Sequence, residues 1–188
     1  MFCILISLKL HSQVTVVLPL STVDYTNGAY FKDFDNELLP YVGTWEGILN
    51  NKKYTFVFQK FTQHLISSAP LSDNYLYQDL LKGKFEVIEL STGAVIYSSL
   101  SAINYEDFPI LGVVKPYNGR FDFYFQDTEI NCENGLEFSL RNIPSQPNQL
   151  KYYWFRYNDW YKSDCSMYSD RMDIPIFLPM QELILTKL

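Results

Sequence analysis

The chain has 188 residues, of which 47% are hydrophobic and 17% aromatic, and its formal net charge is −6. A chain of this length is expected to form one domain that buries about 70% of its unfolded surface. The acidic balance and the lack of any run of Lys and Arg exclude a nucleic-acid-binding surface, which needs clustered positive charge. The high aromatic content favours β-strands.

The N-terminal stretch 1–12 is mostly apolar and is followed by the polar residue Gln13. It is too short for a transmembrane span, which needs ~20 apolar residues. We interpret it as a truncated signal peptide that lacks its positively charged start, which predicts cleavage near Ser12 and a secreted or periplasmic protein. The alternative interpretation is a buried first strand, because residues 14–18 are β-prone.

Whether the cysteines of this chain form a disulfide depends on the cellular compartment. Cys3 leaves with the signal peptide if the protein is exported, and Cys132 and Cys165 then remain. Both lie in predicted loops, so they are a candidate disulfide in an oxidising environment. Buried unpaired thiols are the alternative.

Residues 13–40 are predicted to form a leader segment before a single domain at 41–188. Asn27-Gly28 is a turn signal, and the stretch 33–37 is acidic and aperiodic. Carboxylates of this kind bind calcium in EF-hands, but the Gly and the distant Glu of such a loop are missing here. We therefore interpret 33–37 as a solvated loop or one helical turn.

The rest of the chain shows successive strands separated by short polar turns, and Asn-Gly pairs precede two of them. The predicted strands are 41–47, 54–60, 84–90, 94–100, 120–126, 136–141, 149–160 and 182–188. This pattern predicts an all-β fold, an antiparallel meander closed as a barrel, with a β-sandwich as the alternative. Closure requires the first core strand to pair with the last, because only closure removes the exposed edges.

That pairing predicts structural roles for three residues. Trp45, in the first core strand, is expected to be buried at one end of the barrel, with the ammonium of Lys187 over its indole ring. Gly43, in the same strand, belongs to the same Gly-x-Trp motif.

The motif Val42-Gly43-Thr44-Trp45 resembles the Gly-x-Trp of lipocalin and calycin barrels. More closely, the sequence resembles a family of small exported bacterial proteins with a lipocalin-like pattern and no assigned activity. The resemblance covers most of 40–188 and includes 54–60, 83–93 and Leu185-Thr186-Lys187. It implies a lipocalin-like barrel and export, and it implies no activity.

Few residues are suited to catalysis. The two histidines, His11 and His64, are too few for a zinc site, and no nucleophile motif accompanies them. We therefore predict no metal and no cofactor, and we interpret His64 as an exposed residue beside a turn. Four carboxylates, however, are candidates for the acid–base pair of a carbohydrate-active enzyme. They are Asp122, Asp127, Glu129 and Glu137.

The aromatic stretch 152–161 predicts a binding site. Alternate residues of a strand face opposite sides, so either Tyr153, Phe155 and Tyr157 or the residues between them fill the core. An aromatic second face is typical of a surface for apolar ligands or sugars. The predicted ligand-binding residues are Tyr152, Trp154, Arg156 and Trp160. The predicted function is binding of a small hydrophobic or glycan ligand. The alternatives are a structural or interaction protein of the cell envelope without a pocket, and the carbohydrate-active enzyme.

Overall fold

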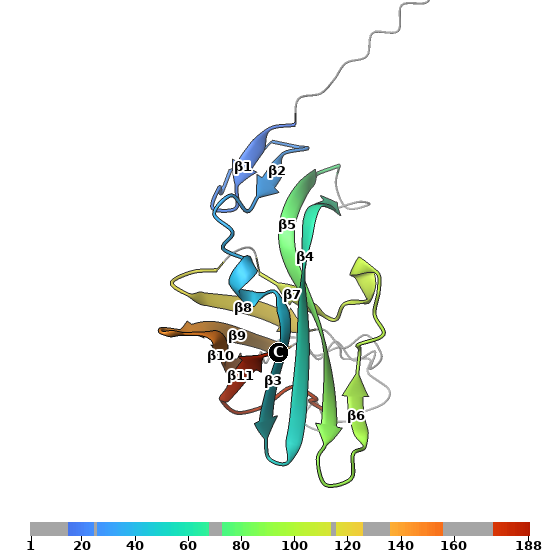
Figure 1. Cartoon of the computed structure of the whole chain (residues 1–188). Helices are drawn as coiled ribbons and strands as arrows, with labels where there is room; N and C mark the ends of the chain where they lie inside the picture. The colour runs from blue at the N-terminus through green and yellow to red at the C-terminus, as the bar shows by residue number, and fades with distance from the viewer. Residues whose placement is uncertain (1–14, 25, 68–72, 114–115, 126–135, 156–174) are drawn as a thin grey trace, which may run out of the picture.

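The structure, a computed structural model, describes residues 15–24, 26–67, 73–113, 116–125, 136–155 and 175–188 (Figure 1). In this part of the chain the elements are strands and two short 3-10 helices, Leu39–Tyr41 (η1) and Tyr105–Asp107 (η2). The strands are Val17–Pro19 (β1), Tyr30–Lys32 (β2), Gly43–Leu49 (β3), Lys52–Ser67 (β4), Tyr75–Glu89 (β5), Val95–Ser98 (β6), Ile110–Gly112 (β7), Arg120–Phe125 (β8), Leu136–Ile143 (β9), Gln146–Phe155 (β10) and Leu183–Lys187 (β11).

Eight of these strands form a closed antiparallel barrel. Their order is β3-β4-β5-β7-β8-β9-β10-β11, and β11 returns to pair with β3. The predicted all-β fold with an antiparallel barrel is therefore confirmed, and the fold is not the alternative sandwich. The turn between β3 and β4 is Asn50-Asn51, and both residues have positive φ, 49° and 61°. These are the angles that a tight two-residue hairpin turn requires.

The closure of the barrel has the predicted geometry. Lys187 of β11 pairs with Trp45 of β3, and its ammonium nitrogen lies 5.2 Å from the centre of the indole ring. The indole is fully buried, and its Nε1 donates a hydrogen bond of 2.8 Å to the backbone oxygen of Tyr41. Gly43 has φ +123°, and a Cβ there would lie 3.0 Å from Cε of Lys187. Gly43 is thus required both by its backbone angle and by the Lys187 side chain beside it.

The interior of the barrel is filled with aromatic rings. The ring of Phe56 lies 5.6–6.1 Å, centroid to centroid, from four other rings. They are those of Phe58 on the same strand, Phe85 on β5, Phe138 on β9 and Tyr152 on β10. Gly83 makes room for this packing, since a Cβ on it would lie 2.7 Å from the ring of Phe58. Leu and Phe residues of the other strands complete the buried cluster. The interior is thus a packed core.

The β4–β5 hairpin is longer than predicted. The strands predicted at 54–60 and 84–90 extend to Lys52–Ser67 and Tyr75–Glu89. Pairing continues past a bulge between Phe61 and His64, where Gln63 has φ +50°. The bulge interrupts the period-2 alternation, which is why the sequence pattern ends there. We call the outer part of the hairpin, residues 61–67 and 75–80, the arm.

One edge of β5 has three partners in succession. It pairs with β2 near Tyr77, with β7 at Gly83 and with β6 near Val87, while its other edge pairs with β4. The described part of the predicted leader, 13–40, is attached here, because β1 and β2 extend the sheet beside the arm in parallel. In Figure 1 these strands lie above the barrel. The signal-peptide prediction for 1–12 lies outside the described residues.

Candidate functional site

The predicted ligand-binding residue Tyr152 belongs to the core. It is fully buried, and its ring lies 6.0 Å from the ring of Phe56 and 5.0 Å from that of Phe138. Burial raises the pKa of its hydroxyl well above the usual value. The structure therefore selects the second orientation considered for this strand, in which Tyr152 faces inward. A core residue of this kind cannot contact a ligand at the surface.

The other members of that predicted set divide into two groups. Trp154 is half-buried and packs against the core from the same strand. Arg156 and Trp160 lie outside the described residues, as do Cys132 and Cys165. Of the two predicted residues that the structure describes, neither Tyr152 nor Trp154 lines the groove described next.

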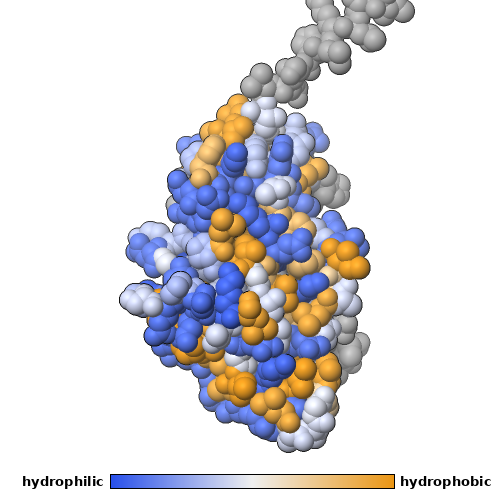
Figure 2. Space-filling model, viewed as in Figure 1, coloured by the Kyte–Doolittle hydropathy of each residue, from blue (hydrophilic) through white to orange (hydrophobic). Residues whose placement is uncertain are grey.

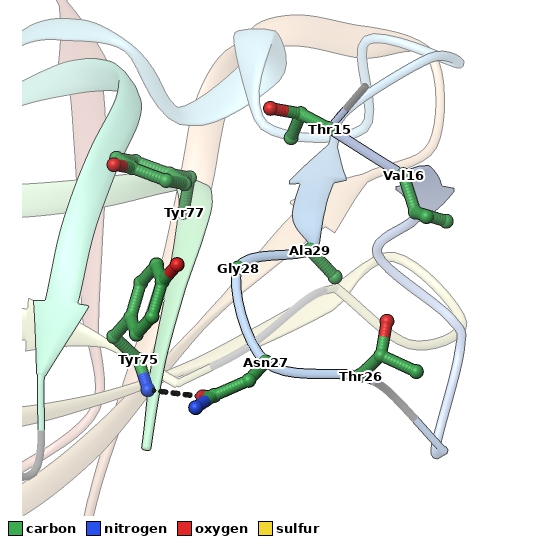
Figure 3. Close-up of a pocket in the computed structure, with 8 residues that line it drawn as sticks. All are labelled: Thr15, Val16, Thr26, Asn27, Gly28, Ala29, Tyr75 and Tyr77. Atoms are coloured by element: carbon green, nitrogen blue, oxygen red, sulfur yellow. Dashed lines mark hydrogen bonds between the residues drawn. The ribbon is translucent and has the colours of Figure 1, made fainter. Parts of the chain in front are cut away.

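A groove of about 480 Å³ lies instead beside the arm (Figure 3). One wall is the pair Tyr75 and Tyr77 of β5, and the other is formed by two segments of the N-terminal part of the chain. The lining residues, which we call the groove, are Thr15, Val16, Thr26, Asn27, Gly28, Ala29, Tyr75 and Tyr77. The two walls are therefore far apart in the sequence.

The turn at Asn27-Gly28 joins the walls. Oδ1 of Asn27 accepts a hydrogen bond of 2.7 Å from the backbone N–H of Tyr75, and Nδ2 donates one of 2.9 Å to the backbone oxygen of Asp73. The N–H of Gly28 donates to the backbone oxygen of Tyr75 at 2.9 Å. Gly28 has φ +80°, and a Cβ there would lie 3.0 Å from the hydroxyl of Tyr75. Glycine is needed at this position by both criteria.

The groove is polar but uncharged. The side chains of its eight described lining residues include the hydroxyls of Thr15, Thr26, Tyr75 and Tyr77, and none of the eight has a carboxylate or ammonium group. The two tyrosine rings lie edge to face, with centroids 6.2 Å apart. The amide of Asn27 is already used within the fold. The groove therefore offers hydroxyl groups and aromatic surface, which suits a neutral ligand with its own hydroxyls.

One side of this site is predicted from the sequence. Asn27-Gly28 is predicted to form a turn, whereas no predicted strand includes Tyr75 and Tyr77. Their i, i+2 spacing places both on one face of a strand. That spacing is the sequence signal for this wall of the groove. It is weak because the alternation does not extend over a longer stretch of the region.

A buried charge cluster lies where the N-terminal segment meets the arm. We call Tyr30, Asp33, Lys60 and Asp79 the latch. The ammonium of Lys60 lies 2.8 Å from Oδ2 of Asp33 and 3.6 Å from Oδ2 of Asp79, and both carboxylates are at most 3% exposed. The prediction of a solvated loop for 33–37 is therefore wrong at Asp33. Its carboxylate is buried because it accepts hydrogen bonds from the backbone N–H groups of Glu37 and Leu38 as well as from Lys60.

Asp79 has a similar set of donors. Its carboxylate accepts hydrogen bonds from the hydroxyl of Tyr30 at 2.6 Å and from the backbone N–H groups of Gln63 and Asp33. Burial acts to raise the pKa of Asp79, but these bonds and Lys60 together lower it. Burial and the bond to Asp79 raise the pKa of Tyr30 to about 12. Every partner of the Asp79 carboxylate is a hydrogen-bond donor or a positive charge. The latch therefore favours ionised Asp79 and neutral Tyr30.

The candidate enzymatic carboxylates lie elsewhere. Asp122 and Glu137 are on the outer face of β8 and β9, away from the groove. Asp122 accepts a hydrogen bond of 2.7 Å from Nε of Arg120, and burial together with Asp122 raises the pKa of Glu137. Asp127 and Glu129 lie outside the described residues. The carboxylate pair stays a prediction.

His64 is not the exposed residue that the sequence suggested. It is half-buried in β4, and its ring stacks on that of Tyr105 at 3.5 Å between centroids. Lys82 lies over the same tyrosine ring at 4.2 Å and donates to the backbone oxygen of Tyr105 at 2.8 Å. Burial lowers the pKa of both His64 and Lys82. These contacts attach the loop around η2 to the outside of β5.

Within the described residues, no three or more His, Cys, Asp and Glu side chains are grouped as metal ligands. The helices described there are also too short and too polar to span a membrane.

Comparisons with protein-family models, with curated proteins and with solved structures find no match to this chain. The fold and the site therefore define its class directly. It is an eight-stranded closed antiparallel barrel with a packed interior and an arm that carries an uncharged groove.

Proposed function

We propose that the protein is a non-enzymatic binding protein that takes a neutral glycan in the groove. The observation that carries this proposal is the groove's lining, four hydroxyl groups and two tyrosine rings without a charged side chain. Sugars present both C–H faces, which pack on aromatic rings, and hydroxyls, which exchange hydrogen bonds with hydroxyls. A hydrophobic ligand is less well served, because the apolar interior is already filled.

Titration with neutral oligosaccharides tests this proposal. A panel of linear glucans, mannans and chitooligosaccharides is added to the full chain, and binding is followed by saturation-transfer NMR and calorimetry. Tyr75→Ala is expected to weaken binding about 3- to 10-fold, the loss of one aromatic contact. Tyr77→Phe removes only a hydroxyl and tests the hydrogen-bonding part.

Tyr117→Ala is the matched control, because Tyr117 is 73% exposed and lies in the turn before β8. It is expected to bind like the wild type. Equal losses for Tyr75→Ala and Tyr117→Ala, or no binding of any neutral saccharide, would contradict the proposal.

A structural or interaction protein is the second candidate, and the packed interior favours it. Such a protein is expected to bind no oligosaccharide of the panel and to co-purify with a macromolecular partner.

Export and a Cys132–Cys165 disulfide are part of the proposed setting. The apolar stretch 1–12 supports the former, and export in turn supports the latter. N-terminal sequencing of exported material is expected to begin near Gln13. Thiol labelling of unfolded, non-reduced protein is expected to leave both cysteines unmodified. A start at Met1 or labelled cysteines would contradict these expectations.

A further inference from the structure

The groove depends on the docking of one chain segment onto another. Its N-terminal wall, at residues 26–29, and its β5 wall are joined at the backbone by few hydrogen bonds. Those from Gly28 to Tyr75 and from Tyr77 to Ala29 are 2.9 and 2.8 Å long. The pairing of β2 with β5 covers only Tyr30 and Phe31. The buried side chains of Ala29 and Phe31 pack into the core cluster beside this short pair, and a polar attachment across the same boundary adds to them.

The latch supplies that attachment. It crosses the same boundary as the groove: Tyr30 and Asp33 come from the N-terminal segment, and Lys60 and Asp79 come from the hairpin. β2 connects the two sites, since Ala29 of the groove precedes its first residue and Asp33 follows its last. Ala29 of the groove is also followed directly by Tyr30 of the latch, and on β5 a single residue separates Tyr77 of the groove from Asp79 of the latch.

We propose that the latch is a positioning device that assembles the groove, so that ligand and latch stabilise the same docked state of residues 15–40. The coupling to ligand rests on the function proposed above, whereas the docking itself does not. Because coupling free energies are reciprocal, a ligand that bridges the two walls strengthens docking, and an intact latch favours the binding-competent state.

Hydrogen exchange of backbone amides tests the docking without any ligand. The amides of Gly28 and Tyr77 bond across the interface between the segment and β5, and that of Tyr30 bonds to Val16 in the β1–β2 pair of the docked segment. The amides of β3 and β9 report on the barrel. Asp79→Asn keeps the shape but turns an NH2 group toward the surrounding donors. It is expected to speed exchange at these three amides about 100-fold, because the hydroxyl of Tyr30 and the N–H groups of Asp33 and Gln63 lose a charged acceptor. The barrel amides that exchange through local opening, and not through global unfolding, are expected to keep the wild-type rate.

Tyr30→Phe is the milder variant if Asp79→Asn does not fold. It removes one hydrogen bond to Asp79 and is expected to speed exchange at the same amides about 10-fold. Asp122→Asn is the control, because Asp122 is a half-exposed carboxylate of the barrel. Unchanged exchange at the three amides, or equal acceleration of exchange in the barrel, would overturn the proposal that the latch holds the segment in its docked state.

The experiment that tests the coupling to ligand uses a neutral oligosaccharide that binds the wild type. At 100 times its Kd it is expected to slow exchange at Gly28, Tyr30 and Tyr77 about 100-fold, because it binds only the docked state. Binding without such slowing overturns the coupling. If no saccharide binds, the proposed function and the coupling both fail, while the exchange of the Asp79→Asn and Tyr30→Phe variants still decides the docking.

Discussion

The hydroxyl of Tyr152 is buried and has no hydrogen-bond partner among the described residues, whereas that of Tyr30 donates to a carboxylate. A buried polar group without a partner contributes nothing to stability, and its removal is neutral or favourable. We therefore expect Tyr152→Phe to leave the free energy of unfolding unchanged or to raise it. Tyr30→Phe is expected to lower it by about 1.5 kcal/mol, the lower end of the range for a hydrogen bond to a charged group. Urea unfolding of both variants gives the comparison, and a larger loss for Tyr152→Phe would contradict it.

Trp45 and Lys187 are in contact but differ in burial. Trp45 is fully buried, so Trp45→Ala is expected to cost about 3–5 kcal/mol through the lost contacts and the cavity. Lys187→Ala removes a partly exposed cation–π contact and is expected to cost about 0.5–1 kcal/mol. Thermal and urea unfolding measure both losses. Similar losses for the two variants contradict the view that Lys187 is a minor partner.

At the scale of elements, attachment of the N-terminal segment is expected to depend on pH at both extremes. Asp79 faces Tyr30 of β2, Lys60 of β4 and the neighbouring Asp33, and its pKa is lowered in the folded protein. The stabilisation from Asp79 is therefore complete above its unfolded pKa, near 3.8, and is lost as the pH falls through the lower folded value.

The stabilisation from Tyr30 depends on pH in the opposite direction. Its pKa is raised from 10.0 to about 12, so its stabilisation is complete below pH 10 and is lost as the pH rises toward 12. Hydrogen exchange at Gly28 and Tyr77, or NMR shifts of these residues, is expected to show loosening at both ends of the range. The Tyr30→Phe variant is the control, because it lacks the alkaline transition of Tyr30. An alkaline transition of unchanged size in that variant contradicts the assignment.

The loop between β6 and β7 is held by two lysines of β5. Nζ of Lys84 donates to the backbone oxygens of Leu100 and Ala102, at 2.8 and 2.6 Å, and Lys82 donates to that of Tyr105. Lys84→Met keeps the side-chain stem but removes both hydrogen bonds. It is expected to make this loop the first site of cleavage in limited proteolysis. Lys53→Met, which affects only a partly exposed ion pair with Glu46, is the control and is expected to leave the cleavage pattern unchanged.

Several of the strands that the sequence predicts correctly share one property. Their apolar residues alternate over a full strand and are bounded by turn residues, as in Phe121, Phe123 and Phe125 after Asn118-Gly119. One buried face and a positive-φ turn specify such a hairpin locally. The pairing of β3 with β11 was predicted without local information, because closure of the meander demands it.

The arm and the groove were not predicted, for physical reasons. The bulge between Phe61 and His64 breaks the alternation, so the continuation of β4 has no periodic signal. The groove requires Gly28 and Tyr75 to meet, and that contact depends on the parallel pairing of β2 with β5. No sequence pattern specifies the partner of a three-residue strand. Burial of Asp33 likewise depends on Lys60 and Asp79, which lie far along the chain.

For the whole molecule, the pairing of β3 with β11 has a consequence during synthesis. A ribosome releases β3 early and β11 only after all the other barrel strands, so the nascent barrel is an open sheet. Until β11 arrives, β3 and β10 each expose an edge with free N–H and C=O groups. Neighbouring nascent chains carry the same edges and can pair with them, a route to aggregation. Insertion of β11 pairs both edges at once and ends that interval, so a chain that lacks β11 keeps both edges open to other chains.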